Sequence, residues 1–156
     1  MEINGLPLHP LLVHAVVILV PLGALSAILF AVLPGWRWLL RWPTLLFAVG
    51  AVVIVRIAVI SGNDLRHDRK LDSPLIDKHM DWASRLEWSV WVYAVIAVVA
   101  CWVLPHVTPL KDREDRESPM GSLTTAATIL LPISAAVVLV FAVITGEAGA
   151  QAVWKA

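Results

Sequence analysis

The chain has 156 residues, of which 59% are hydrophobic, and its mean hydropathy is +0.79. A soluble domain has about 45–50% apolar residues, so this composition argues against an ordinary soluble protein. The 12 basic residues balance the 12 acidic ones, so no net positive charge favours nucleic acid as a partner. The charged residues cluster between long apolar runs, which is typical of a multi-pass protein of the lipid bilayer.

Four segments are long and apolar enough to cross about 30 Å of hydrocarbon, for which about 20 residues are needed. Pro10 suits the first turn of the first helix, and Ser73-Pro74 is a signal for the start of the third. We predict an all-α fold, an antiparallel four-helix transmembrane bundle forming a single integral membrane domain over residues 1–156. The expected helices are 10–33, 44–61, 74–104 and 122–145, followed by a short C-terminal tail.

The ends of these segments indicate how the chain sits in the membrane. Glu2 is acidic and no basic residue precedes the first apolar run, so we expect that run to be a retained span. The first loop, PGWRWLLRWP (34–43), mixes Trp and Arg as interfacial belts do. Lys and Arg are nearly balanced between the two sides. Their slight excess beside the termini favours an inner (plasma) membrane protein with both termini in the cytoplasm.

An antiparallel bundle brings the start of the first and third helices and the end of the second and fourth to one face. Four of the five histidines are expected on that face, and His106 on the opposite one. The polar residues predicted to converge there are His9, His14, Arg56, Asp64, His67, His79, Trp82, Arg85 and Glu147.

Each of these residues also has a plain structural interpretation. His9 precedes a proline and is expected to be extended. His14 lies one turn inside its span, where a polar group faces the bundle interior, a wet cavity or a hydrogen-bond partner on another helix. Arg56 either extends to the near surface or pairs with Glu147 or Asp64. His67, inside LRHDRK, is expected to be solvated.

Four short motifs carry a resemblance to a known family: LPLHPLLVH (6–14), SG (61–62), LIDKH (75–79) and TGEAGAQAVW (145–154). Together they resemble the domain of unknown function 2231 family of small bacterial membrane proteins, over nearly the whole chain. The resemblance implies four membrane helices and no settled activity. It makes His9, His14 and His79 the signature histidines. Some relatives are joined to c-type cytochrome domains, and many carry His or Asp where this chain has Glu147.

Three functions remain open on these residues. The first is a b-type haem with His14 and His79 as axial ligands, bordered by Trp82 and Arg56. Such a site would transfer electrons to a redox partner or quinone. The second is a divalent metal site formed by His9, His14, His79 and either Glu147 or Asp64, because nitrogen and carboxylate ligands suit first-row metals.

The third is a structural or partner-binding membrane subunit without a cofactor, in which the polar cluster joins helices through hydrogen bonds. The sequence has no GxSxG elbow, phosphate-binding loop or HExxH pair, so it gives no hydrolase signature. It has no inverted repeat that would favour a transporter. Whether the protein is an enzyme is undecided at this point.

Overall fold

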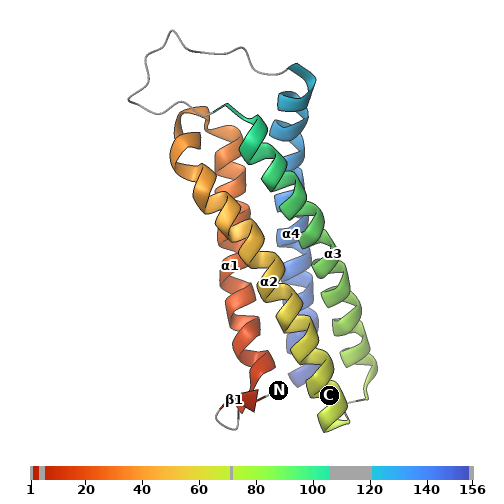
Figure 1. The fold of residues 1–156 in the computed structure, drawn as a ribbon. Coiled ribbons are helices and arrows are strands. Elements are labelled where there is room, and N and C mark those ends of the chain that lie inside the picture. The colour runs from red at the N-terminus through yellow and green to blue at the C-terminus, as the bar shows by residue number, and fades with distance from the viewer. Residues whose placement is uncertain (1, 4–5, 71, 106–120, 155–156) are drawn as a thin grey trace.

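Four long helices make up most of the computed structural model, which describes residues 2–3, 6–70, 72–105 and 121–154 (Figure 1). A small antiparallel pair, β1 (Glu2–Ile3) and β2 (Leu6–Pro7), precedes them and was not predicted. A 3-10 turn, η1 (Pro34–Trp36), joins the first two helices. The helices are α1 (Leu8–Val32), α2 (Arg37–Arg69), α3 (Pro74–Val103) and α4 (Gly121–Trp154).

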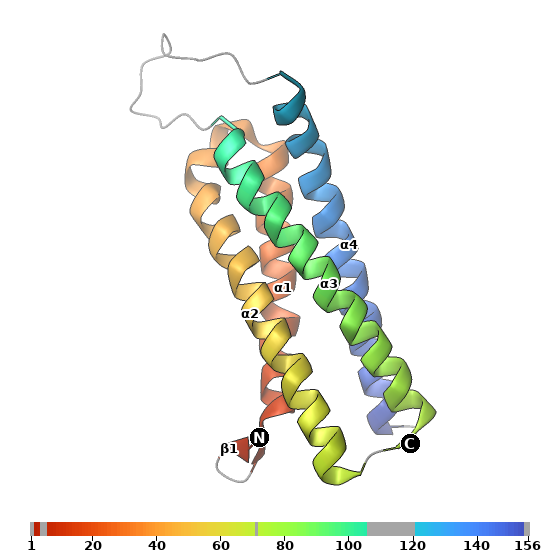
Figure 2. The same ribbon diagram turned by 45° about the vertical axis from the view of Figure 1, so that its right-hand side comes forward.

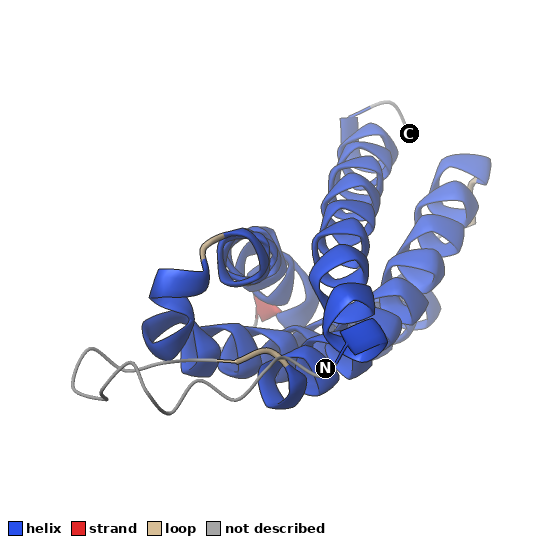
Figure 3. Cartoon of the chain, turned by 90° about the horizontal axis from the view of Figure 1, so that it is seen from above, coloured by secondary structure: helices blue, strands red, loops and turns tan. Residues whose placement is uncertain are grey.

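The predicted all-α four-helix bundle is confirmed. Successive helices run in opposite directions, and the described chain begins and ends at the same end of the bundle (Figures 1 and 2). Each of the four is long and apolar enough to cross a membrane. Seen from above, helix accounts for nearly all of the described chain (Figure 3).

Two helices are longer than predicted. α2 extends from Arg37 to Arg69, well beyond the apolar 44–61, and α4 continues through the predicted tail to Trp154. Hydropathy marks the stretch inside the hydrocarbon, whereas a helix continues in water wherever its neighbours pack against it. α2 ends where Lys70 adopts a left-handed conformation with a φ of 50°, which is a common way to end a helix.

The surplus helix length projects from one side of the membrane. α2, α3 and α4 have 33, 30 and 34 residues, or about 45–50 Å at 1.5 Å per residue, against about 30 Å of hydrocarbon. Exposed Trp36, Trp42 and Trp102 mark one interface at the α1–α2 connection, where the Arg41 guanidinium lies over two of these rings. The surplus therefore lies at the other end, where α1 begins.

Small residues fill the middle of the bundle. Ala24, Ala27, Ala48 and Ala97 are fully buried, which lets the helix backbones approach closely as membrane helices commonly do. Tyr93 crosses this core and donates a 2.9 Å hydrogen bond from its hydroxyl to the carbonyl of Gly23. Leu86, Val90, Tyr93 and Ala97, which recur at three- and four-residue steps along α3, are all buried, so this side of the helix belongs to the core.

The two helix hairpins, α1–α2 and α3–α4, bury matching positions. Buried residues of α1 and α3 can be paired at the same sequence spacing as His9 and His79. The pairs are Val16 and Leu86, Val20 and Val90, Ala24 and Ala94, and Ala27 and Ala97. Buried residues of α2 and α4 can be paired in the same way, at the spacing of Gly62 and Gly149. The pairs are Thr44 and Leu131, Ala48 and Ala135, Ala51 and Val138, and Ser61 and Ala148. Because α1 and α3 run in the same direction, the hairpins are parallel copies of one unit and not an inverted repeat.

A buried hydroxyl pair joins α1 to α2 within the first hairpin. Ser26 Oγ and Thr44 Oγ1 lie 2.8 Å apart, and both residues are buried. Thr44→Val is expected to lower the free energy of unfolding by about 1 kcal/mol, because hydrogen bonds between membrane helices contribute about that much. Unfolding in detergent micelles measures the change. Thr125→Val, on an exposed face of α4, is the control, and equal stability of the two variants would contradict the prediction.

Candidate functional site

His9 lies in the first turn of α1 and packs against α2. Contrary to the expectation of an extended residue before proline, it is helical, because Pro10 sits in the first turn, where a helix needs no N–H. Its Nδ1 lies 3.0 Å from the carbonyl oxygen of Ala58 and 3.3 Å from Ser61 Oγ. Since a carbonyl only accepts, Nδ1 carries the proton and Nε2 keeps a lone pair. The ring lies so close to Gly62 that a Cβ there would be 3.0 Å from Cε1.

His79 repeats this arrangement one turn into α3. Its Nδ1 donates to the carbonyl oxygen of Thr145 on α4 at 3.0 Å, which again leaves Nε2 as the acceptor nitrogen. A Cβ on Gly149 would lie 2.9 Å from the Cε1 of this ring. In both hairpins the glycine stands four residues after the accepting carbonyl, so each imidazole packs closely against a helix that has no side chain at that point.

The two imidazoles meet between the hairpins. Their ring centroids are 6.3 Å apart and their planes are inclined at 73°. They line a small apolar cavity of about 60 Å³ together with Thr145, whose hydroxyl oxygen is buried without a partner in the described part of the chain. The other residues of the cavity wall are Val13, Val16, Val17, Val55, Ala58, Val59, Ala83, Leu86, Ala142 and Gly146.

His14 lies apart from this cavity. Its side chain is exposed, and its Nδ1 donates a 2.6 Å hydrogen bond to the carbonyl oxygen of Pro10 on the same helix. Arg56 is also on an outer face, where its guanidinium pairs with Glu87 of α3 at 2.9 Å. The predicted partners Glu147 and Asp64 are not the ones it binds here. The haem pairing expected from the sequence therefore has only one of its two histidines at the cavity.

Trp82 and Glu147 border the site without entering the cavity. The Trp82 ring packs on Phe141 of α4 at 5.8 Å between centroids, with the Arg85 guanidinium 4.8 Å above it. Glu147 is exposed and accepts a hydrogen bond from Gln151 at 3.1 Å. Of the predicted metal set, the structure brings together His9 and His79. No group of three or more His, Cys, Asp or Glu gathers around a metal position in the described ranges.

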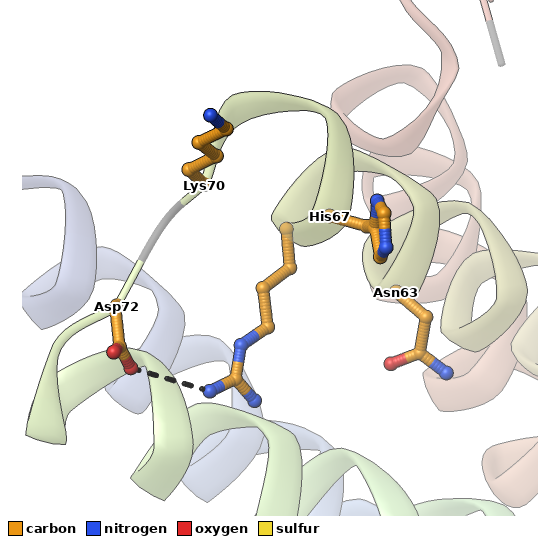
Figure 4. A pocket seen from close by; sticks show the side chains of 5 residues that line it. Asn63, His67, Lys70 and Asp72 are labelled. Carbon is orange, nitrogen blue, oxygen red and sulfur yellow. Dashed lines mark ion pairs between the residues drawn. The ribbon is translucent and has the colours of Figure 1, made fainter.

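A second, open groove lies beyond the site, between the end of α2 and the start of α3 (Figure 4). Arg66 crosses it and pairs with Asp72 at 3.6 Å and Asp77 at 2.7 Å. His67 is exposed there, as its polar surroundings predict. His106, expected at the opposite face, lies outside the described residues.

A porphyrin does not fit between His9 and His79. The cavity of about 60 Å³ is several times smaller than the roughly 300 Å³ at which pockets for drug-sized ligands begin. Because the rings pack closely against Gly62 of α2 and Gly149 of α4, the space between them can hold only a group as small as a single ion.

The chain was compared with known protein families. The family described as "Predicted membrane protein (DUF2231)" matches residues 5–156. The chain belongs to this family. No curated protein and no solved structure matches it. In this DUF2231 chain the four recognised motifs meet at one place, since His9 docks on the SG pair of α2 and His79 docks on the TGEAG stretch of α4.

Sequence reasoning missed two features of the site. It assigned no role to Thr145, although a hydroxyl beside two glycines in the last membrane helix is a detectable signal. It also missed Glu87 as the partner of Arg56. Glu87 stands at the polar end of an apolar stretch. A carboxylate at the edge of a membrane span is usually paired with a cation, here Arg56 on the neighbouring helix.

Proposed function

We propose that this four-span membrane protein binds one transition-metal ion between His9 and His79, at one face of the membrane. The observation that carries the proposal is the state of the two rings. Both rings line a shared cavity, and both give their Nδ1 proton to a backbone carbonyl, which leaves the Nε2 lone pair to bind a metal. Histidine ligands of metals are typically held in this way, with the second nitrogen donating to a carbonyl or carboxylate.

The spacing of the rings supports the proposal. With a metal–nitrogen distance of about 2.0–2.1 Å and a ring radius of about 1.1 Å, one ion can bond two imidazoles whose centroids are up to about 6.4 Å apart. That limit applies to a linear arrangement, and the observed separation of 6.3 Å is close to it. A tetrahedral ion such as Zn²⁺ would draw the two rings about 1 Å closer together. Imidazole nitrogens suit Zn²⁺, Cu and Ni²⁺. Water would complete the coordination, because the described protein ligands number two.

The depth of the site supports access from water. α1 has 25 residues, so His9 lies about 35 Å from the far end of that helix, at the edge of about 30 Å of hydrocarbon. An ion would reach it from the aqueous side through the headgroup layer. We further infer an inner membrane location with this face and both termini in the cytoplasm, supported by the slight Lys and Arg excess beside the termini.

The alternative is a structural or partner-binding subunit without a cofactor. It is favoured by the same two hydrogen bonds, since His9 links α1 to α2 and His79 links α3 to α4. In that case the rings would hold each hairpin together and the cavity would carry no ion.

Metal content separates the two functions. We expect detergent-purified protein, incubated with Zn²⁺ and desalted, to retain about one ion per chain in elemental analysis. His9→Ala and His79→Ala should each reduce the retained metal about tenfold or more, because losing one of two ligands leaves a single imidazole. His14→Ala and Glu147→Gln should retain the ion. Wild-type protein that retains no metal would support the alternative function. Loss of metal in His14→Ala would show that His14 is a ligand, as expected from the sequence.

A further inference from the structure

Thr145 carries a buried hydroxyl that the packing of the bundle does not use. The residue is 8% exposed and lines the cavity between His9 and His79. Its backbone carbonyl accepts the His79 hydrogen bond, but its Oγ1 has no hydrogen-bond partner in the described part of the chain. A buried hydroxyl without a partner costs about 1–3 kcal/mol, so a group that satisfies it would be held firmly.

Two other threonines of α4 show what a hydroxyl in this helix ordinarily does. Thr125 and Thr128 donate to the carbonyls of Gly121 and Thr124 at 3.1 and 2.9 Å, each four residues earlier. A threonine inside a helix commonly makes this bond. Thr145 does not make it, so its oxygen remains available at the cavity.

The repeat shows that this hydroxyl is not needed to hold a histidine. Ala58 occupies the equivalent position in the first hairpin, and its carbonyl accepts from His9 at 3.0 Å, the same distance as from Thr145 to His79. The first hairpin has a hydroxyl of its own on Ser61, but that one is satisfied because it donates to the Ala58 carbonyl at 2.9 Å. The unsatisfied hydroxyl of Thr145 is therefore an addition to the common unit.

The cavity has room for an ion together with water. Its volume of about 60 Å³ compares with the roughly 30 Å³ that one water molecule occupies in the liquid. A buried water needs two to four polar partners. The Thr145 hydroxyl and an ion held by the two Nε2 atoms supply two of them.

Resting on the proposed metal function, we propose that Thr145 selects the kind of ion that the site takes. Its hydroxyl hydrogen-bonds a water molecule on the ion between His9 and His79, so the site holds a hydrated divalent ion such as Zn²⁺. A monovalent Cu⁺ ion bound linearly by two imidazoles carries no such water and gains nothing from the hydroxyl. Thr145 is thus a positioning residue that acts through the water.

The test compares Zn²⁺ and Cu⁺ binding to wild-type protein, Thr145→Val and Thr145→Ser, with Thr128→Val as the matched control. Thr145→Val should weaken Zn²⁺ binding about tenfold, as losses of outer-shell partners do, and leave Cu⁺ binding unchanged. Thr145→Ser should restore Zn²⁺ affinity. The metal-free melting temperature of Thr145→Val should equal or exceed that of the wild type, because the variant removes an unsatisfied buried hydroxyl.

Three results would overturn the inference in distinguishable ways. Unchanged Zn²⁺ affinity in Thr145→Val would remove the role of the hydroxyl and leave the two-histidine site standing. An equal loss of Zn²⁺ and Cu⁺ affinity, with a lower melting temperature, would make the residue structural. Wild-type protein that binds neither ion would overturn the proposed metal function itself.

Discussion

Replacing Gly149 with alanine is expected to displace the His79 imidazole and weaken Zn²⁺ binding tenfold or more. The added Cβ would lie 2.9 Å from Cε1, closer than real Cβ contacts, and 3.1 Å from Nδ1, tighter than most of them. The ring would have to shift away from α4, which would weaken its hydrogen bond to the Thr145 carbonyl and move Nε2. We expect the variant to melt at a lower temperature and to retain little metal in elemental analysis.

Gly50→Ala, inside α2 and away from the cavity, is the control. A Cβ at Gly50 meets no atom within 4 Å, so alanine there should gain up to about 1 kcal/mol of stability from its better helix propensity. Gly62→Ala should weaken metal binding as Gly149→Ala does, because its Cβ would lie 3.0 Å from the Cε1 of His9. If Gly149→Ala behaved like Gly50→Ala, the close docking of His79 would be contradicted.

The second large effect is expected at Arg37, at the opposite end of the bundle. The sequence placed this residue in an interfacial belt, yet it is 6% exposed. Its Nε donates to the Phe30 carbonyl at 3.1 Å and its Nη2 to the Ala31 carbonyl at 2.9 Å. These carbonyls belong to the last turn of α1, where a helix lacks internal donors and favours a cation.

Arg37→Met is therefore expected to lower the free energy of unfolding by about 3 kcal/mol, because two buried carbonyls lose charged donors. Arg37→Lys should recover part of the loss, since an ammonium can reach one carbonyl but lacks the planar fork. Equilibrium unfolding in mixed micelles measures both. Arg69→Met, at an exposed site on α2, should change stability by less than about 0.5 kcal/mol. If the free energy of unfolding changed as little in Arg37→Met, water rather than Arg37 would be satisfying the carbonyls at the end of α1.

The sequence predicts the four helices well because apolar length alone determines a membrane span. It does not predict their ends. The segment after Ser61 is polar, so hydropathy places it in a loop, while the structure continues α2 to Arg69, where Arg66 pairs with Asp77 of α3. Those contacts depend on the neighbouring helix and leave no trace in the local pattern.

The convergence of polar residues at one end follows from topology, but their pairing does not. His14 lies four residues after Pro10 and His79 five residues after Pro74, so the sequence places the two at similar depth. Depth says nothing about rotation around the helix axis, and the structure turns His14 outward and His9 inward. The glycines that receive the rings were visible as motif positions, but their purpose is clear only when each helix is seen against its partner.

The most direct test of the His9–His79 site is X-ray absorption at the zinc edge of the Zn²⁺-loaded protein. We expect scattering from two imidazole nitrogens at about 2.0–2.1 Å per ion, completed by oxygen ligands. His9→Ala and His79→Ala should each leave at most one. Zinc surrounded by oxygen alone in the wild type, or variant spectra that are unchanged from the wild-type spectrum, would contradict a shared two-histidine site.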